Sequence, residues 1–143
     1  MPVLVFFVTF FGMEALAWAM HKYVLHGPLW FLHKTHHRPS KSFWERNDLF
    51  ILVYAVPSFI FTFRGIEYDL PYETAVGLGI AAYGLAYFIV HDILIHRRVK
   101  LWRKPKSRYL RALVRGHKVH HKHLHKEGSE VFGFLMVPRR FFR

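Results

Sequence analysis

The sequence predicts an all-α fold: a polytopic membrane bundle of about three transmembrane helices, plus cytoplasmic helices that carry a histidine-rich dimetal site. Two observations predict it. In the first, 52% of the 143 residues are apolar and yet the formal net charge is +12. The apolar and the basic residues occupy separate stretches of the sequence. Long apolar blocks set apart from basic blocks are typical of polytopic membrane proteins. The second observation is the repeated spacing of the histidines. The length indicates a single domain over residues 1–143.

The first apolar block, residues 2–20, is long enough to cross a bilayer core of about 30 Å. A secretory signal peptide is the alternative. Ala15-Leu16-Ala17 resembles a cleavage site and favours it, and the lack of a basic segment before the block disfavours it. An acidic side chain in a membrane helix usually faces a partner inside the protein. Glu14 lies two helical turns before His21, on nearly the same face, so we expect it to form supporting hydrogen bonds rather than to act as a ligand.

The second block, residues 49–63, is short for a span but can begin near residue 43. Asn47 and Asp48 precede it and are predicted to cap its N-terminus. Pro57 predicts a kink, which neighbouring helices tolerate in a membrane bundle.

The third block, residues 72–96, is the clearest span. Gly77, Ala81 and Gly84 recur on one helix face, which predicts close packing against another helix. The same face continues to His91, which is therefore predicted to point into the bundle.

The charge pattern predicts an orientation. Residues 97–126 hold twelve of the 21 Lys and Arg, whereas the loop 64–71 holds one. The positive-inside rule then places the N-terminus outside and the histidines and the C-terminus in the cytoplasm, with the protein in the inner (plasma) membrane. Tryptophans flank the cytoplasmic ends of the spans, at positions 18, 30, 44 and 102. Residues 109–119 are predicted to form a helix, and the tail 130–143 to lie among lipid headgroups.

Ten of the twelve histidines fall into four boxes with two repeated spacings. HxxxxH occurs at His21 and His26 and at His91 and His96, and HxxHH occurs at His33, His36 and His37 and at His117, His120 and His121. Residues five apart on an α-helix differ by about 140°, so HxxxxH converges only where the helix bends, widens or stops. Gly27-Pro28 offers such a stop after His26. Positions i, i+3 and i+4 share a face, so the HxxHH of residues 33–37 is predicted to converge from one helical turn.

These ten histidines are the predicted metal ligands. Cysteine is absent, so thiolate sites are excluded and any metal is held by imidazole, with carboxylate as a possible addition. Ten rings exceed what one ion can take, which indicates two ions with about five rings each; the spacing does not name the metal. Glu14, Asp48 and Asp92 are candidates to support the site, and Asp92 stands beside His91. Ligand rings must be unprotonated, so the metals are expected to leave below about pH 6.5.

Four segments carry a resemblance to a known family: GMEALAWAMHKYVLHG, HKTHH followed by FWERNDLF, AYGLAYFIVHDILIH and HKVHHKHLHKEGSEVFGFL. The chain resembles the membrane di-iron superfamily of fatty acid hydroxylases and desaturases, and within it the bacterial β-carotene hydroxylases. The resemblance implies a non-haem di-iron monooxygenase that uses O2 and converts β-carotene to β-cryptoxanthin and zeaxanthin by hydroxylation at carbon 3. It also implies a ferredoxin-type electron donor with an NAD(P)H reductase. The family's ligands correspond to the ten box histidines, and nothing transfers to His123 or His125.

Other functions fit parts of the pattern. A hydroxylase or desaturase of a fatty acyl or sterol chain would share the histidine boxes. A divalent-metal transporter would place its ligands near the bilayer midplane, whereas these histidines gather at the ends of the spans. A purely structural membrane protein leaves the boxes unexplained. The positive charge fits anionic lipids or an acidic partner, and no motif for nucleic acid accompanies it.

Overall fold

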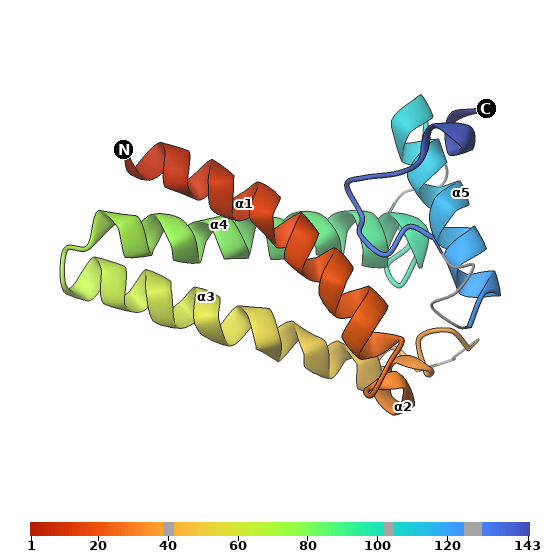
Figure 1. The fold of residues 1–143 in the computed structure, drawn as a ribbon, viewed down its shortest axis with the longest axis horizontal. Coiled ribbons are helices and arrows are strands. Elements are labelled where there is room, and N and C mark those ends of the chain that lie inside the picture. Colours follow the sequence, from red (N-terminus) through yellow and green to blue (C-terminus); the bar gives the residue numbers. More distant parts are fainter. Residues whose placement is uncertain (39–41, 102–104, 125–129) are drawn as a thin grey trace. The chain divides into compact units, whose positions relative to one another are not determined.

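The computed structural model describes residues 1–38, 42–101, 105–124 and 130–143, and these residues form helices and no strand (Figure 1). The α-helices are α1 (Pro2–Ala19), α2 (Trp30–His33), α3 (Phe50–Glu67), α4 (Pro71–Tyr87) and α5 (Arg108–Lys122). Two π-helices, η1 (Met20–Leu25) and η3 (Phe88–Ile95), and two 3₁₀-helices, η2 (Arg46–Leu49) and η4 (Arg139–Phe142), complete the order. The all-α prediction is confirmed.

The chain divides into two compact units. The first comprises residues 1–13 and 48–86, and the second comprises residues 14–47 and 87–143. Helix α1 passes from the first unit into the second at residue 14. The expectation of a single domain stays a prediction.

Three helical segments are long and apolar enough to cross a membrane: Pro2–Leu25, Arg46–Glu67 and Pro71–Ile95. Large apolar side chains on them are exposed, for example Phe7 on α1 and Phe59 on α3. Exposure of this kind is unfavourable in water and favourable against lipid. The segments agree with the three predicted spans and indicate an integral membrane protein. Trp102 lies outside the described residues.

Helix α3 does not begin as predicted. The residue before it is Leu49, no side chain caps it, and Asn47 forms a different hydrogen bond, described below. The capping prediction for Asn47 and Asp48 is therefore wrong, because η2 leads directly into α3 and continues the helical backbone. The α-helix continues through Pro57 to Glu67.

Within the first unit, α3 and α4 approach each other closely at Gly77. A β-carbon there would lie 2.2 Å from Thr62 Oγ1 and 2.5 Å from the Thr62 backbone nitrogen, and the Ser58 hydroxyl donates a 2.8 Å hydrogen bond to the Gly77 carbonyl. A β-carbon at Gly84 would meet nothing within 4 Å. The close-packing prediction therefore holds at Gly77 and fails at Gly84.

Gly77→Ala is expected to destabilise the first unit by about 1–3 kcal/mol, the usual cost of overpacking. The added methyl group meets backbone as well as a side chain, so rotation of the Thr62 side chain alone cannot relieve the clash. The matched control is Gly84→Ala, which has room for the methyl group. Thermal unfolding in detergent should separate the two variants, and equal midpoints would contradict the packing described here.

The HxxxxH boxes coincide with the two π-helices. The His26 amide donates to the His21 carbonyl at 3.0 Å, and the His96 amide donates to the His91 carbonyl at 2.9 Å. A hydrogen bond from residue i+5 to residue i closes one turn of a π-helix, so the two side chains lie one above the other. The helix widens at both boxes. The first π-helix also ends at Leu25, just before His26 and Gly27-Pro28, as predicted, whereas the second ends at Ile95 without such a pair.

The second unit gathers the remaining elements around α5. One face of α5 is buried at positions 112, 113, 116, 117 and 120, while its Lys and Arg are exposed. The tail packs against that helix, since a β-carbon at Gly116 would lie 2.8 Å from a methyl group of Val131. Residues 131–134 are buried in the protein, so the prediction that the whole tail lies among headgroups is wrong for this part.

Candidate metal centre

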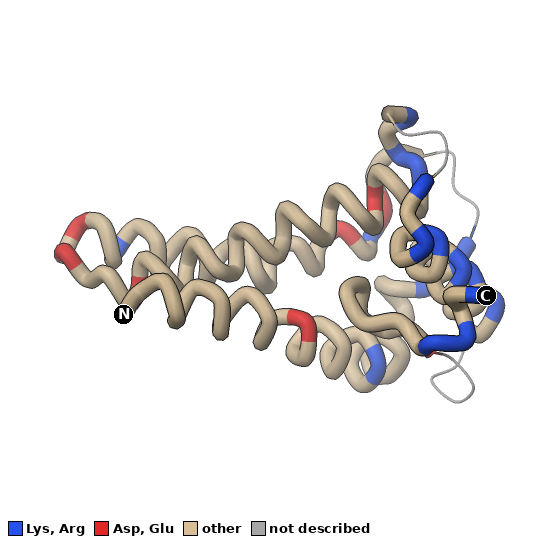
Figure 2. The backbone as a smooth tube through the Cα atoms, turned by 90° about the horizontal axis from the view of Figure 1, so that it is seen from above, with Lys and Arg blue, Asp and Glu red and all other residues tan. Residues whose placement is uncertain are grey.

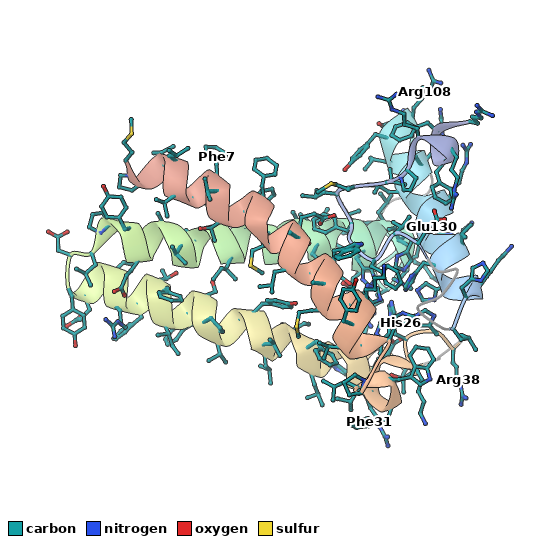
Figure 3. All side chains as sticks on the ribbon, in the orientation of Figure 1. Phe7, His26, Phe31, Arg38, Arg108 and Glu130 are labelled. Carbon is teal, nitrogen blue, oxygen red and sulfur yellow. The ribbon has the colours of Figure 1, made fainter. Side chains whose placement is uncertain are left out.

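The second unit brings nine of the ten box histidines into two clusters. The first cluster comprises His21, His26, His33, His37 and His120, and the second comprises His36, His91, His96 and His117. Within each cluster, one ring nitrogen per residue lies within 4.8 Å of the others. Figure 3 labels His26 among these crowded rings, beside α5. Two groups of this size match the expectation of two ions with about five rings each.

Each HxxHH box is divided between the clusters. Helix α2 ends at His33, and the turn that follows sends His36 to the second cluster while His37 stays in the first. On α5, His117 joins the second cluster and His120 the first. The prediction that residues 33–37 converge from one helical turn is therefore wrong, because the helix ends before the box is complete.

His121 belongs to neither cluster but contacts both. Its ring stacks on His37 of the first cluster, with 4.5 Å between ring centroids, and lies 4.5 Å from His117 of the second. Its Nε2 is buried and has no hydrogen-bond partner among the described residues. His123 is exposed just past the end of α5, and His125 lies outside the described residues.

Two rings of the first cluster are oriented by oxygen acceptors without charge. His21 Nδ1 donates to the Phe132 carbonyl at 2.7 Å, and His33 Nδ1 donates to Asn47 Oδ1 at 2.7 Å. A neutral imidazole carries one proton, so a ring that donates from Nδ1 presents a lone pair at Nε2. The Nε2 atoms of His21 and His33 are nevertheless 2.9 Å apart.

Two rings of the second cluster are oriented by carboxylates. His36 Nδ1 donates to Glu45 Oε2 at 3.0 Å, and His91 Nδ1 lies 3.3 Å from Asp92 Oδ2. Arg98 joins the two carboxylates, at 3.2 Å from Glu45 and 3.1 Å from Asp92. The Nε2 atoms of His36 and His91 are buried without a partner in the described part of the chain.

The donor atoms fit metal ions. Two nitrogens that each lie about 2.1 Å from one metal are about 3.0–3.4 Å apart for angles between 90° and tetrahedral. The Nε2–Nε2 distances are 2.9 Å for His21–His33, 3.1 Å for His33–His37, 3.3 Å for His26–His120 and 2.8 Å for His96–His117. No proton is available between His21 and His33, where two lone pairs face each other. A cation between such nitrogens turns this repulsion into coordination.

Burial keeps these rings neutral. It lowers the pKa of His33 and of His37 to about 3 and the pKa of His121 to about 4, because a charged ring is poorly solvated inside the protein. Burial, and then repulsion between neighbouring rings, also lowers the pKa values of His36, His96, His117 and His120. Protons should therefore compete with a bound metal only at a pH well below the value of about 6.5 predicted from the sequence. Retention of the metals at pH 5 would be compatible with imidazole ligation.

The protein without metal is expected to lose stability as the pH falls below about 6.5. The folded-state pKa values of His33, His37 and His121 lie below the unfolded value, so the unfolded chain takes up protons first. The contribution of each ring is complete above about pH 6.5 and declines by at most about 1.4 kcal/mol per pH unit down to its folded pKa, and by less for His37, which solvent partly screens. Thermal unfolding of chelated protein at pH 7.5, 6.0 and 5.0 measures this, and a constant midpoint would contradict it.

Glu14 holds the tail against α1. Its carboxylate accepts backbone hydrogen bonds from Phe134, Leu135 and Met136 at 3.3, 2.9 and 3.0 Å, and the residue is 2% exposed. The same stretch of tail supplies the Phe132 carbonyl to His21. Glu14 thus acts on the first cluster indirectly, by holding the tail whose Phe132 carbonyl binds His21. This agrees with a supporting rather than a ligand role.

A hollow of about 520 Å³ opens beside this contact. Its lining includes Trp18 from α1 and Val131 and Met136 from the tail. Val131 directly precedes Phe132, whose ring lies against His21 and His26 of the first cluster. An apolar group in the hollow would therefore be separated from that cluster by the tail.

Sequence reasoning missed four contributors: Glu45, Asn47, Arg98 and the Phe132 carbonyl. Glu45 and Asn47 follow the first HxxHH closely, so their spacing offered a signal, whereas a backbone carbonyl leaves none. Asp92 lies beside His91 as expected from the sequence. Asp48 belongs to the first unit, and its supporting role stays a prediction.

Comparison with known proteins gives a consistent set of relatives. The sequence model of the fatty acid hydroxylase family ("Fatty acid hydroxylase") matches residues 6–140. A β-carotene hydroxylase of Pantoea ananas is 42% identical over 135 residues, which cover 94% of this chain and 77% of the relative. A β-carotene hydroxylase of Paracoccus sp. (strain PC1) is 37% identical over 136 residues, 94% of this chain and 83% of the relative. No solved structure was found to match the chain.

Proposed function

Because the chain belongs to the fatty acid hydroxylase family, we propose that it is an O2-dependent, non-haem di-iron monooxygenase that hydroxylates the β-ionone rings of β-carotene at carbon 3. The products are β-cryptoxanthin and then zeaxanthin. The observation that carries the proposal is the pair of buried, all-imidazole clusters with lone pairs turned inward, in a chain 42% identical to a β-carotene hydroxylase.

The ten box histidines would hold the two irons. The first cluster would bind one ion and the second cluster the other, with His121 available to either. When bound, the irons would supply the activation of O2 and the oxidation of an unactivated C–H bond, which no side chain can provide.

The protein's own groups do three things in this proposal. Burial keeps the imidazoles unprotonated, the oxygen acceptors at Nδ1 fix the direction of the rings, and the apolar surroundings keep water away. β-Carotene dissolves only in the bilayer, so it reaches the site from between the helices.

The electron donor is proposed to be a ferredoxin-type protein served by an NAD(P)H reductase. Lys and Arg gather along α5 and the C-terminal segment, as Figure 2 shows, and Arg108, Arg111, Arg115 and Lys118 are exposed there. Such a surface attracts acidic proteins and, at its edge, anionic lipids. The positive-inside rule supports a cytoplasmic location for this surface and an external N-terminus in the inner membrane.

The test is expression in a bacterium that accumulates β-carotene and has its own ferredoxins, followed by chromatography of the pigments. Appearance of β-cryptoxanthin and zeaxanthin supports the proposal. Unchanged β-carotene beside well-inserted protein would refute the carotenoid assignment. Hydroxylated or desaturated fatty acids in the same cells would then identify the alternative substrate class, which is the one that the family's description names.

A further inference from the structure

We propose that metal binding in the first cluster is reciprocally coupled to the docking of the tail residues 131–136, and that Tyr109 is a positioning residue which acts on the cluster through this tail. The inference rests on the proposed function, because it requires that the first cluster binds a metal ion. It gives a role to a hydroxyl group whose hydrogen bond goes to the tail rather than to a histidine.

The tail is held from both sides at Leu135. Its amide donates to Glu14 Oε1 on α1 at 2.9 Å, and its carbonyl accepts a 2.5 Å hydrogen bond from the Tyr109 hydroxyl on α5. Burial, and then the neighbouring Glu14 carboxylate, raises the pKa of Tyr109, so the hydroxyl keeps its proton and donates at neutral pH. Earlier in the same stretch, the Phe132 carbonyl accepts from His21 Nδ1 at 2.7 Å. Displacement of the tail at Leu135 is therefore passed to His21 along a short piece of backbone.

The tail and a metal ion use opposite nitrogens of the His21 ring. His21 donates its Nδ1 proton to the Phe132 carbonyl, and His33 donates its Nδ1 proton to Asn47 Oδ1. Both rings then present lone pairs at Nε2, and these two atoms are 2.9 Å apart. A cation between them preserves both hydrogen bonds. Without a cation the lone pairs repel each other, unless one ring moves its proton to Nε2 and gives up its oxygen acceptor.

The tail is the acceptor that we expect to be released. Asn47 lies in η2, which continues directly into α3. Phe132 instead follows Val131, whose φ of 60° is a conformation that β-branched residues rarely adopt. Strain of this kind persists only where the surrounding contacts hold it. Release of the tail relieves the strain and returns to water the Phe132 carbonyl that His21 no longer binds.

The coupling acts in both directions. A bound metal ion favours the form of His21 that holds the tail, so a docked tail favours the metal ion by the same factor. Coupling between two sites typically changes affinity by about 5–150-fold. Weakening the contact at Tyr109 should therefore lower the metal affinity of the first cluster more than that of the second.

The first experiment is hydrogen exchange followed by mass spectrometry on the full-length protein in detergent at pH 7.5. The protein is either loaded with Zn2+ alone or freed of metal by a chelator. Without metal, the amides of residues 131–136 should exchange about 5–150-fold faster, whereas those of residues 109–116 in α5 should change less. Unchanged exchange in the tail, or an equal increase in both peptides, would overturn the coupling.

Tyr109→Phe tests the opposite direction, since it removes one hydroxyl group and keeps the ring. The tail should exchange faster, and a Zn2+ titration followed by calorimetry should show one weakened step. In a His33→Ala background, which lacks a ligand of the first cluster, the same change should have little effect on the remaining step. The control is Tyr68→Phe, at an exposed tyrosine of the first unit. A tail as well protected as in the control, or normal Zn2+ affinity beside an open tail, would overturn the inference.

Failure here is distinguishable from failure of the proposed function. Protein that binds Zn2+ in the first cluster with an unchanged tail would refute only the coupling. Protein that binds no metal there would refute the coupling and the proposed metal centre together. Neither measurement uses carotene or O2, so the pigment assay remains an independent test of hydroxylation.

Discussion

Replacing His120 by alanine is expected to abolish formation of hydroxylated carotenoid and to leave the protein with one bound metal ion instead of two. His120 is 0% exposed, and its Nε2 lies 3.3 Å from His26 Nε2 inside the first cluster. Loss of a group behind a ligand costs 10–100-fold in metal affinity or activity. Loss of the ring itself should therefore lower metal affinity or activity by more than about 100-fold. The hydroxylated product should then fall below detection.

The control is His123→Ala, which removes an imidazole three residues further along the chain. His123 is exposed beyond the end of α5, so both product and metal content should match the parent protein. The measurements are chromatography of the pigments and metal analysis of purified protein. Two metal ions and normal zeaxanthin in His120→Ala would show that this ring is not a ligand.

His120 also matters because each half of the chain, residues 21–37 and residues 91–120, contributes histidine rings to both clusters. The first cluster takes four rings from residues 21–37 and His120 from the other half, while the second takes three rings from residues 91–117 and His36 from the first half. Each half thus gives one ring to the cluster built mainly by the other. Neither half should form its metal site alone, as the sequence predicts.

The transmembrane helices could be predicted from the sequence because a bilayer selects long apolar segments whatever their neighbours are. The gathering of the histidines could be predicted as well, since ten histidines in repeated spacings have few uses other than metal binding. The division of the HxxHH boxes could not. The first box is divided because α2 ends at His33 and a turn follows, and the second is divided along the continuous helix α5; spacing alone specifies neither.

The groups behind the ligands were harder to predict for a related reason. Asn47 looked like a helix cap, and the helical backbone of η2 released its side chain to bind His33. Glu45 and Arg98 meet only because their segments are brought together in the second unit. The position of the Phe132 carbonyl depends on the path of the tail, which the buried Glu14 carboxylate holds in place.

Glu14→Gln is expected to release that tail. The carboxylate accepts three backbone hydrogen bonds, from Phe134, Leu135 and Met136, and bonds to a charged acceptor contribute about 1.5–3 kcal/mol each. The amide keeps one oxygen, turns an N–H group toward at least one donor and removes the charge. The cost should be about 2–4 kcal/mol, or at least about 30-fold faster local opening by the relation of 1.4 kcal/mol per factor of ten.

Hydrogen exchange followed by mass spectrometry measures this opening in the peptide that contains residues 130–137. Glu67→Gln is the control, since Glu67 is exposed at the end of α3. Exchange in the tail as slow as in the control would contradict the role of Glu14. Faster exchange should be accompanied by weaker metal binding in the first cluster, because the Phe132 carbonyl no longer fixes His21. The tail would then be a working part of the first metal site, held there by the acidic residue of the first transmembrane helix.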